Sequence, residues 1–266
     1  MLAHSAAASV VPTAQGDWLF SPMWTEMTPP DVYWEPRYTY GYETMNQTLK
    51  NLGTGGSSMT AGKLFEPIVT HDFGTGTDYY ISSSTDFTEG DGSGHITSIG
   101  SEEYGGGATL VFLYKASDEG PTSTDALLKV GGIGWKPEYD TGVGYRFDLA
   151  LFSSTGTAQY TGNSYTVIES DNQWRMMTFV NERIDNPSST NDIWRWTTYK
   201  NSTQVFTDDV FLSGQWSSYA DGGGASIIGL ADHNYGSIMR FRYPLNGTQI
   251  TAISDYLETK YGTFGA

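Results

Sequence analysis

Short segments of alternating polarity, separated by turn-forming residues, restrict the folds open to this chain. In residues 146–151, polar or small side chains alternate with Phe147, Leu149 and Leu151. A period of two places the two sets on opposite faces of a β-strand. Strand-like segments recur at 65–70, 78–82, 108–114, 127–133, 144–152, 165–168, 173–180, 193–199, 205–206, 226–230 and 237–243. Such a series predicts an all-β fold.

The connections between these segments are rich in glycine, serine, asparagine and aspartate. The 266 residues include 32 Gly, and only 17% are charged. Gly tolerates the positive φ that tight turns need, and Asn and Asp tolerate it next best. No internal repeat, charge block or low-complexity run divides the chain. We therefore expect one domain over residues 31–266, preceded by an arm at residues 1–30.

The N-terminal arm carries apolar and aromatic side chains. Free termini are ordered only when something holds them down. We expect the arm to pack on its own domain or on a neighbouring subunit. The residues expected to make these contacts are Val10, Val11, Trp18, Phe20 and Trp24.

A helix is predicted near the C-terminus, over residues 245–262. Asn246 is a good N-cap, and Gln249 three positions later completes a capping box. Ile250, Ile253 and Leu257 form an apolar stripe, and Gly262 suits the left-handed stop. We expect the stripe to cover an open sheet edge or the rim of a sandwich.

Charge and cysteine content exclude several functions. With 14 Lys and Arg against 30 Asp and Glu, the net charge is −16, which disfavours nucleic acids and anionic membranes. The chain has no Cys, which excludes disulfides and thiolate chemistry. No apolar run approaches a membrane span, and the first residues lack the basic and apolar regions of a signal peptide.

The C-terminal residues carry a family resemblance. The tail at 256–262 reads Tyr-Leu-Glu-Thr-Lys-Tyr-Gly, and weaker matches lie at 33–36, 49–53 and 173–179. Together these segments resemble the concanavalin-A-like and laminin-G-like jelly-roll domains of bacterial and phage structural or adhesion proteins. The resemblance implies a two-sheet antiparallel jelly-roll sandwich with a short C-terminal helix and an extended N-terminal arm. It implies no single activity, because this fold hosts lectins, glycosidases, adhesins and virion proteins.

Catalytic motifs are missing from the sequence. The glycosidases with this fold carry a Glu-x-Asp-x-Glu strand, whose spacing points the acids into one cleft. The three Glu-x-Asp segments, at 89–91, 138–140 and 169–171, all lack the third acid. The sequence also contains no nucleophile elbow, phosphate-binding loop or His-Glu-x-x-His. We therefore expect no enzymatic activity and no catalytic residues, and rank a glycoside hydrolase last.

Two loop segments have the composition of a glycan-binding or partner-binding surface. Aromatic rings beside turn signals can stack on a pyranose or pack on a neighbouring subunit, and the sequence leaves both open. The candidates are Trp135, Tyr139 and Asp140, and Trp216, Tyr219 and Asp221. No metal or cofactor site is predicted, although acids such as Asp208 and Asp209 leave calcium as an option.

Two functions remain as expectations. The first is a non-enzymatic subunit of a larger assembly, namely a phage virion component that decorates or stabilises a capsid or belongs to a fibre. Its partners would be copies of itself or other capsid or fibre proteins, and it would reside in the virion or at an extracellular surface. The alternative is a lectin-like carbohydrate-binding surface module, with calcium as an optional ion.

Overall fold

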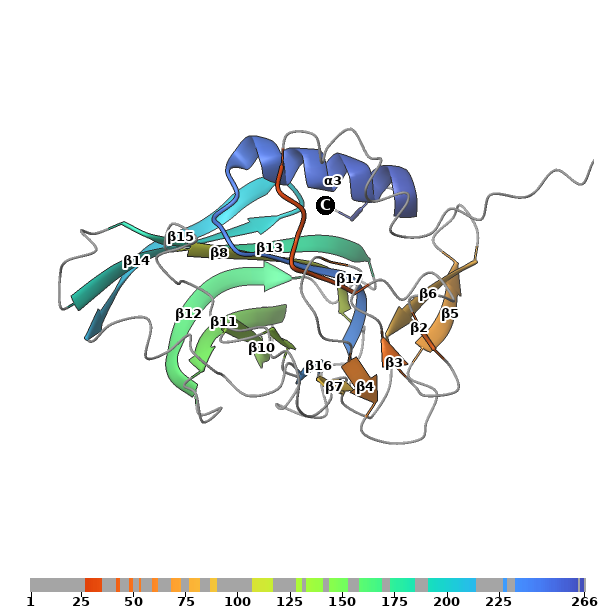
Figure 1. Ribbon diagram of the computed structural model, residues 1–266, viewed down its shortest axis with the longest axis horizontal. Helices are drawn as coiled ribbons and strands as arrows, with labels where there is room; N and C mark the ends of the chain where they lie inside the picture. Colours follow the sequence, from red (N-terminus) through yellow and green to blue (C-terminus); the bar gives the residue numbers. More distant parts are fainter. Residues whose placement is uncertain are drawn as a thin grey trace, which may run out of the picture.

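The protein, seen in a computed structural model, consists mainly of antiparallel strands, with the helix α3 (Gly247–Tyr261) near the C-terminus (Figure 1). The structure describes the backbone of the strands and of α3. It describes side chains at residues 27–33, 53, 107–114, 173–184, 193–209, 236–259, 262 and 264–265. The predicted β-rich chain with a C-terminal helix is thus confirmed.

The strands pair into two sheets, which we call sheet A and sheet B. Sheet A has the order β15-β14-β13-β8-β17-β6-β5, with β1 also paired to β17. Its strands are β1 (Val32–Trp34), β5 (Ile68–Asp72), β6 (Thr77–Ile81), β8 (Gly107–Ala116), β13 (Trp174–Arg183), β14 (Asn191–Lys200), β15 (Thr203–Ser213) and β17 (His233–Phe241).

Sheet B has the order β12-β11-β10-β9-β16-β7-β4-β3-β2. Its strands are β2 (Tyr42–Glu43), β3 (Thr48–Leu49), β4 (Met59–Ala61), β7 (Phe87–Glu89), β9 (Leu128–Val130), β10 (Ile133–Asp140), β11 (Gly144–Phe152), β12 (Ala158–Ile168) and β16 (Ile227–Ile228). In Figure 1, β10, β11 and β12 lie on the side of sheet A opposite α3. The jelly-roll form of a two-sheet sandwich stays a prediction.

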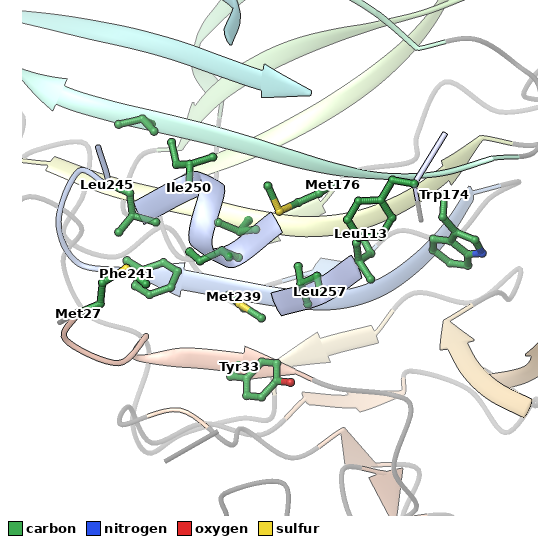
Figure 2. Packing of buried hydrophobic residues seen from close by; sticks show 14 residues of the cluster. Met27, Tyr33, Leu113, Trp174, Met176, Met239, Phe241, Leu245, Ile250 and Leu257 are labelled. Atoms are coloured by element: carbon green, nitrogen blue, oxygen red, sulfur yellow. The ribbon is translucent and has the colours of Figure 1, made fainter. Parts of the chain in front are cut away.

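A cluster of buried hydrophobic residues lies between α3 and the middle strands of sheet A (Figure 2). The predicted stripe of Ile250, Ile253 and Leu257 is fully buried, and each such side chain contributes about 1.5–3 kcal/mol. It packs against alternate residues of the sheet: Val111 and Leu113 of β8, Met176 and Val180 of β13, and Met239 and Phe241 of β17. The helix therefore covers a sheet face, where we had expected an edge or rim, because these strands present an apolar face to it.

The opposite face of the same strands is buried as well. Leu110 and Phe112 of β8 lie beside Phe179 and Met177 of β13, and all four are at most 3% exposed. The rings of Phe112 and Phe179 stack with centroids 6.0 Å apart. Because both faces of β8 and β13 are covered, these two strands form the buried centre of sheet A.

Charged residues join the N-terminal part of the described chain to β17. Arg240 and Arg242 both donate to Asp31, and the Arg242 Nε–Asp31 Oδ2 distance is 2.9 Å. Two positions apart in the chain, the two arginines reach the same carboxylate. Arg240 is only 1% exposed, so its face is part of the interior.

Residues 27–30 are the only part of the predicted arm within the described residues. Met27 belongs to the core cluster beneath α3. The Tyr243 hydroxyl donates to the Thr28 carbonyl at 2.8 Å, and burial raises the pKa of Tyr243 to about 12. This end of the arm therefore packs on its own chain. The predicted contact residues Val10, Val11, Trp18, Phe20 and Trp24 lie outside the described residues.

Candidate functional site

A polar groove lies on β14 and β15, at the edge of sheet A. It is an open depression of about 470 Å³. The described residues that line it are all polar or charged: Arg195, Thr197, Gln204, Thr207, Asp208 and Asp209.

Strand alternation explains why Arg195 and Thr197 face outward. Their neighbours Trp194 and Trp196 are at most 3% exposed, so β14 directs its two tryptophans inward. Tyr199, two residues further along, packs against the cluster beneath α3. The groove thus lies on the same side of sheet A as the helix, over strands that the helix leaves open.

The β14–β15 hairpin determines which groove residues meet. Its turn contains Asn201 at φ 55°, a left-handed conformation that asparagine tolerates well. Asn201 bonds through its backbone and side chain to the backbone of Met176, and its amide donates to the Gly265 carbonyl at 2.9 Å. These bonds attach the turn to β13 and to the C-terminal segment. They thereby help to fix the pairing of β14 with β15.

An ion pair crosses the groove. Arg195 Nε donates to Asp209 Oδ1 at 2.8 Å, and a second guanidinium nitrogen donates to Oδ2 at 3.1 Å. The hydrogen bond from Arg195 lowers the pKa of Asp209, and the same bond raises the pKa of Arg195. Both groups therefore stay charged near neutral pH. Both side chains are also nearly half exposed, so this pair orders the surface more than it stabilises the fold.

Uncharged hydroxyl and amide groups, together with Asp208, make up the rest of the described lining. The hydroxyls of Thr197 and Thr207 lie 3.3 Å apart, and Gln204 lies further along β15. The Asp208 carboxylate accepts from the backbone N–H of Asp209 at 2.9 Å. The groove therefore offers donors and acceptors together, which suits a ligand that carries many hydroxyl groups.

The binding residues predicted from sequence are not tested by this structure. Trp135, Tyr139 and Asp140 lie on the backbone of β10, but their side chains are outside the described residues. Trp216, Tyr219 and Asp221 lie outside them altogether. Both sets stay predictions.

Most of the groove was missed by sequence reasoning, although a signal was present. Only Asp208 and Asp209 were considered, and then as calcium ligands. The alternation of Trp194, Arg195, Trp196 and Thr197 indicates one polar face. A polar face is common on strands, however, and the residues opposite it on β15 cannot be known without the register.

Metal binding and membrane insertion find no support in the described residues. Within them, no group of three or more His, Cys, Asp or Glu is placed to hold a metal ion. Nor does any helix there combine the length and apolar character needed to cross a membrane. Calcium binding elsewhere in the chain stays a prediction.

Solved structures of other proteins resemble this chain in fold. It resembles the receptor-binding domain of botulinum neurotoxin type G, with 12% identity and a TM-score of 0.51 over 86% of this chain and 52% of that one. It is also similar to the binding domain of Paraclostridial Mosquitocidal Protein 1, with 11% identity and a TM-score of 0.52 over 86% and 52%.

A third similar structure belongs to a study of botulinum neurotoxin type C, whose cell entry depends on interaction with two ganglioside molecules. It has 10% identity and a TM-score of 0.56, over 86% of this chain and 51% of that one. At these identities the likeness is one of fold. The chain spans about half the length of the structures it matches. No family model and no curated protein matches the sequence.

Proposed function

We propose that the chain is a non-enzymatic binding module that recognises glycans on a cell surface through the groove on β14 and β15. The observation that carries the proposal is the groove itself: an open depression, lined by hydroxyl, amide and charged groups, on strands that α3 leaves uncovered. The surrounding domain, in this proposal, is a two-sheet jelly-roll sandwich.

The groove is suited to binding because its strands hold the lining residues in place without a ligand. Arg195 and Thr197 project from a strand that is paired on both sides, by β13 and by β15. Groups on such strands lose little conformational freedom on binding, which favours affinity. A saccharide would exchange hydrogen bonds with water for bonds to the threonine hydroxyls and Gln204.

The fold comparison supports the same class of function. The similar structures are binding or receptor-binding domains of toxins, and one is reported with ganglioside interaction. This agrees with the lectin-like alternative drawn from the sequence, and it agrees with the expectation of a non-enzymatic protein. No described contact bears on a phage virion subunit, which stays a prediction.

The test is a glycan array probed with the full chain, with and without calcium. We expect binding to a restricted set of glycans. In the Thr197→Val/Thr207→Val variant, which keeps side-chain shape but loses two hydroxyls, we expect affinity to fall by about tenfold, at roughly 0.5–1.5 kcal/mol per hydrogen bond.

The matched control is Thr251→Val, because Thr251 is an exposed threonine on α3, outside the groove. It should leave glycan affinity unchanged. Absence of binding to every glycan would refute the proposed function. Binding that survives the double valine variant but is lost in Trp135→Ala or Trp216→Ala would move the site to the loops predicted from sequence.

A further inference from the structure

Asn201, in the turn between β14 and β15, is bonded to two other parts of the chain. Its backbone N–H donates to the Met176 carbonyl at 2.7 Å, and its side-chain oxygen accepts from the Met176 N–H at 3.0 Å. These two bonds continue the pairing of β13 with β14 by one residue beyond Lys200. The side-chain amide of Asn201 also donates to the Gly265 carbonyl at 2.9 Å. One residue therefore joins the hairpin both to β13 and to the last described residues.

The residues that Asn201 reaches, Phe264 and Gly265, are themselves held close to β13. We call these two residues the C-terminal segment. Phe264 is buried in the cluster beneath α3, and the Gly265 N–H donates to the Trp174 carbonyl at 2.9 Å. A Cβ at Gly265 would lie 2.6 Å from the Cβ of Gln173, closer than real side chains approach. The segment can therefore lie here only because residue 265 is a glycine.

The turn end of the groove is exposed to solvent. Residues 202–205 are all exposed, and they include Gln204 of the groove lining. The pairing of β14 with β15 is also irregular between Thr198 and Tyr199, next to this end. Parts of a protein with little buried surface open locally at a low free energy. The bonds of Asn201 are therefore well placed to hold Gln204 in position.

We propose that the C-terminal segment controls the groove through Asn201. With the segment in place, the three bonds of Asn201 hold the turn and the residues that follow it. When the segment is released, the turn loses one bond, the start of β15 becomes more mobile, and ligand affinity falls. Coupling between two sites is reciprocal, so a bound ligand should slow the release of the segment. The inference rests on the proposed function for its ligand, but the effect on the hairpin can be measured without one.

Two substitutions break the link from opposite ends. Gly265→Ala displaces the C-terminal segment and leaves the hairpin sequence unchanged. Asn201→Asp retains an oxygen for the Met176 N–H but replaces the donor to Gly265 by a second oxygen. The matched control is Gly247→Ala, because a Cβ at Gly247 meets no atom within 4 Å. All variants are made in the full chain.

Hydrogen exchange followed by NMR reports on the hairpin. In Gly265→Ala and in Asn201→Asp, the protected amides of residues 197–207 should exchange about threefold to tenfold faster, the effect of losing one hydrogen bond. The amides of Ile253 in α3 and Met239 in β17, whose side chains are buried in the core, serve as the internal reference and should change little. Gly247→Ala should leave the exchange of the hairpin unchanged.

Affinity is measured with a glycan that the parent chain binds on the array. Its dissociation constant should rise about threefold to tenfold in each single variant, again the effect of one hydrogen bond. The double variant should lose little more than either single variant, because both substitutions break the same link. A saturating concentration of the glycan should slow exchange of the Gly265 N–H in the parent chain.

The outcomes separate this inference from the proposed function. Unchanged exchange at residues 197–207 in both variants overturns the inference, whether or not glycans bind. Equal acceleration at the reference amides also overturns it, since the whole domain would then be destabilised, and so does faster hairpin exchange with an unchanged dissociation constant. If no glycan binds, the proposed function fails, and the exchange data alone decide whether the segment and the hairpin are coupled. Should Gly265→Ala fail to fold, Asn201→Asp is the deciding variant.

Discussion

Arg195 and Asp209 give the groove its internal order at the scale of single residues. Each lies on a different strand, and each would be a mobile, solvated side chain without the other. Their two-point contact fixes the guanidinium plane beside Thr197 and Thr207. Because the pair is exposed, it adds little to the stability of the fold. It determines the shape and the charge of this part of the surface.

The pH dependence of this contact follows from the lowered pKa of Asp209. A carboxyl whose pKa is lower in the folded protein favours folding above its ordinary pKa, and this contribution is lost as pH falls through the lowered value. The ion pair should therefore persist from neutral pH down through the usual range of aspartate.

Replacing Arg195 by methionine tests this contact. In Arg195→Met, the pKa of Asp209 should rise toward the ordinary value of 3.8, because the hydrogen bond that lowers it is gone. The measurement is a carbon-13 NMR titration of the Asp209 carboxyl carbon. Thr207→Val keeps the guanidinium and should keep the pKa low. Identical titration of Asp209 in the parent and in Arg195→Met would contradict the assignment.

The outward direction of Arg195 could be predicted from its place between two tryptophans. Its partner could not. Asp209 is opposite Arg195 only because the turn at Asn201 and an irregularity after Thr198 set the pairing of the two strands. A shift of one residue would have placed a different side chain there.

Among the elements, α3 agrees most closely with its prediction. Asn246 accepts from the Gln249 N–H, and the Gln249 side chain accepts from the Asn246 N–H, which is the predicted capping box. The helix ends before Gly262, whose φ is 93°. The capping box and the glycine stop involve residues a few positions apart, so they can be recognised from the sequence alone.

Removal of the cap should weaken α3 measurably. Asn246→Ala should lower the free energy of unfolding by about 1 kcal/mol, within the range of 0.5–2 kcal/mol for N-cap loss, because the Gln249 N–H loses its acceptor. Equilibrium urea unfolding measures the change. Asn246→Asp should retain most of the stability, and Thr248→Ala, one exposed position inside the helix, should change it little. A loss in Asn246→Ala no larger than in Thr248→Ala would count against the cap.

Two strands show where local signals mislead. Only 205–206 were expected as strand in β15, which in fact runs to Ser213 through Asp208 and Asp209. Aspartate is a poor strand former, and pairing with β14 overrides that preference. A loop was expected around Trp135, Tyr139 and Asp140, where the structure has β10 with Pro137 inside it. Pro137 is tolerated because β9 pairs only with residues 133–135, so no described strand on that side requires the N–H that proline lacks.

For the molecule as a whole, Asp31 joins distant parts of the chain. It lies 209 residues from Arg240 in sequence, and both are buried. Gly53 adds to the same junction, since a Cβ there would lie 2.7 Å from the Asp31 carbonyl carbon. These contacts attach the entry to β1 to the last strand of the domain.

Breaking this buried ion pair should destabilise the protein strongly. Asp31→Asn should lower the free energy of unfolding by about 3–5 kcal/mol, because it leaves the Arg240 charge buried without its counter-ion. Adding Arg240→Met to Asp31→Asn should recover part of the loss. Urea unfolding of the single and double variants measures the coupling. Additive losses in the double variant would show that the two charges do not act together.

The sequence by itself determined the β-rich class, the C-terminal helix with its cap and apolar stripe, and the acidic charge. These depend on periodicity and on neighbours a few positions apart. Only the tertiary structure decided that α3 covers a sheet face, that Arg240 is buried against Asp31, and that Arg195, Thr207 and Asp209 form one groove. Those features depend on strand register and on contacts between residues far apart in the chain, which no local pattern encodes.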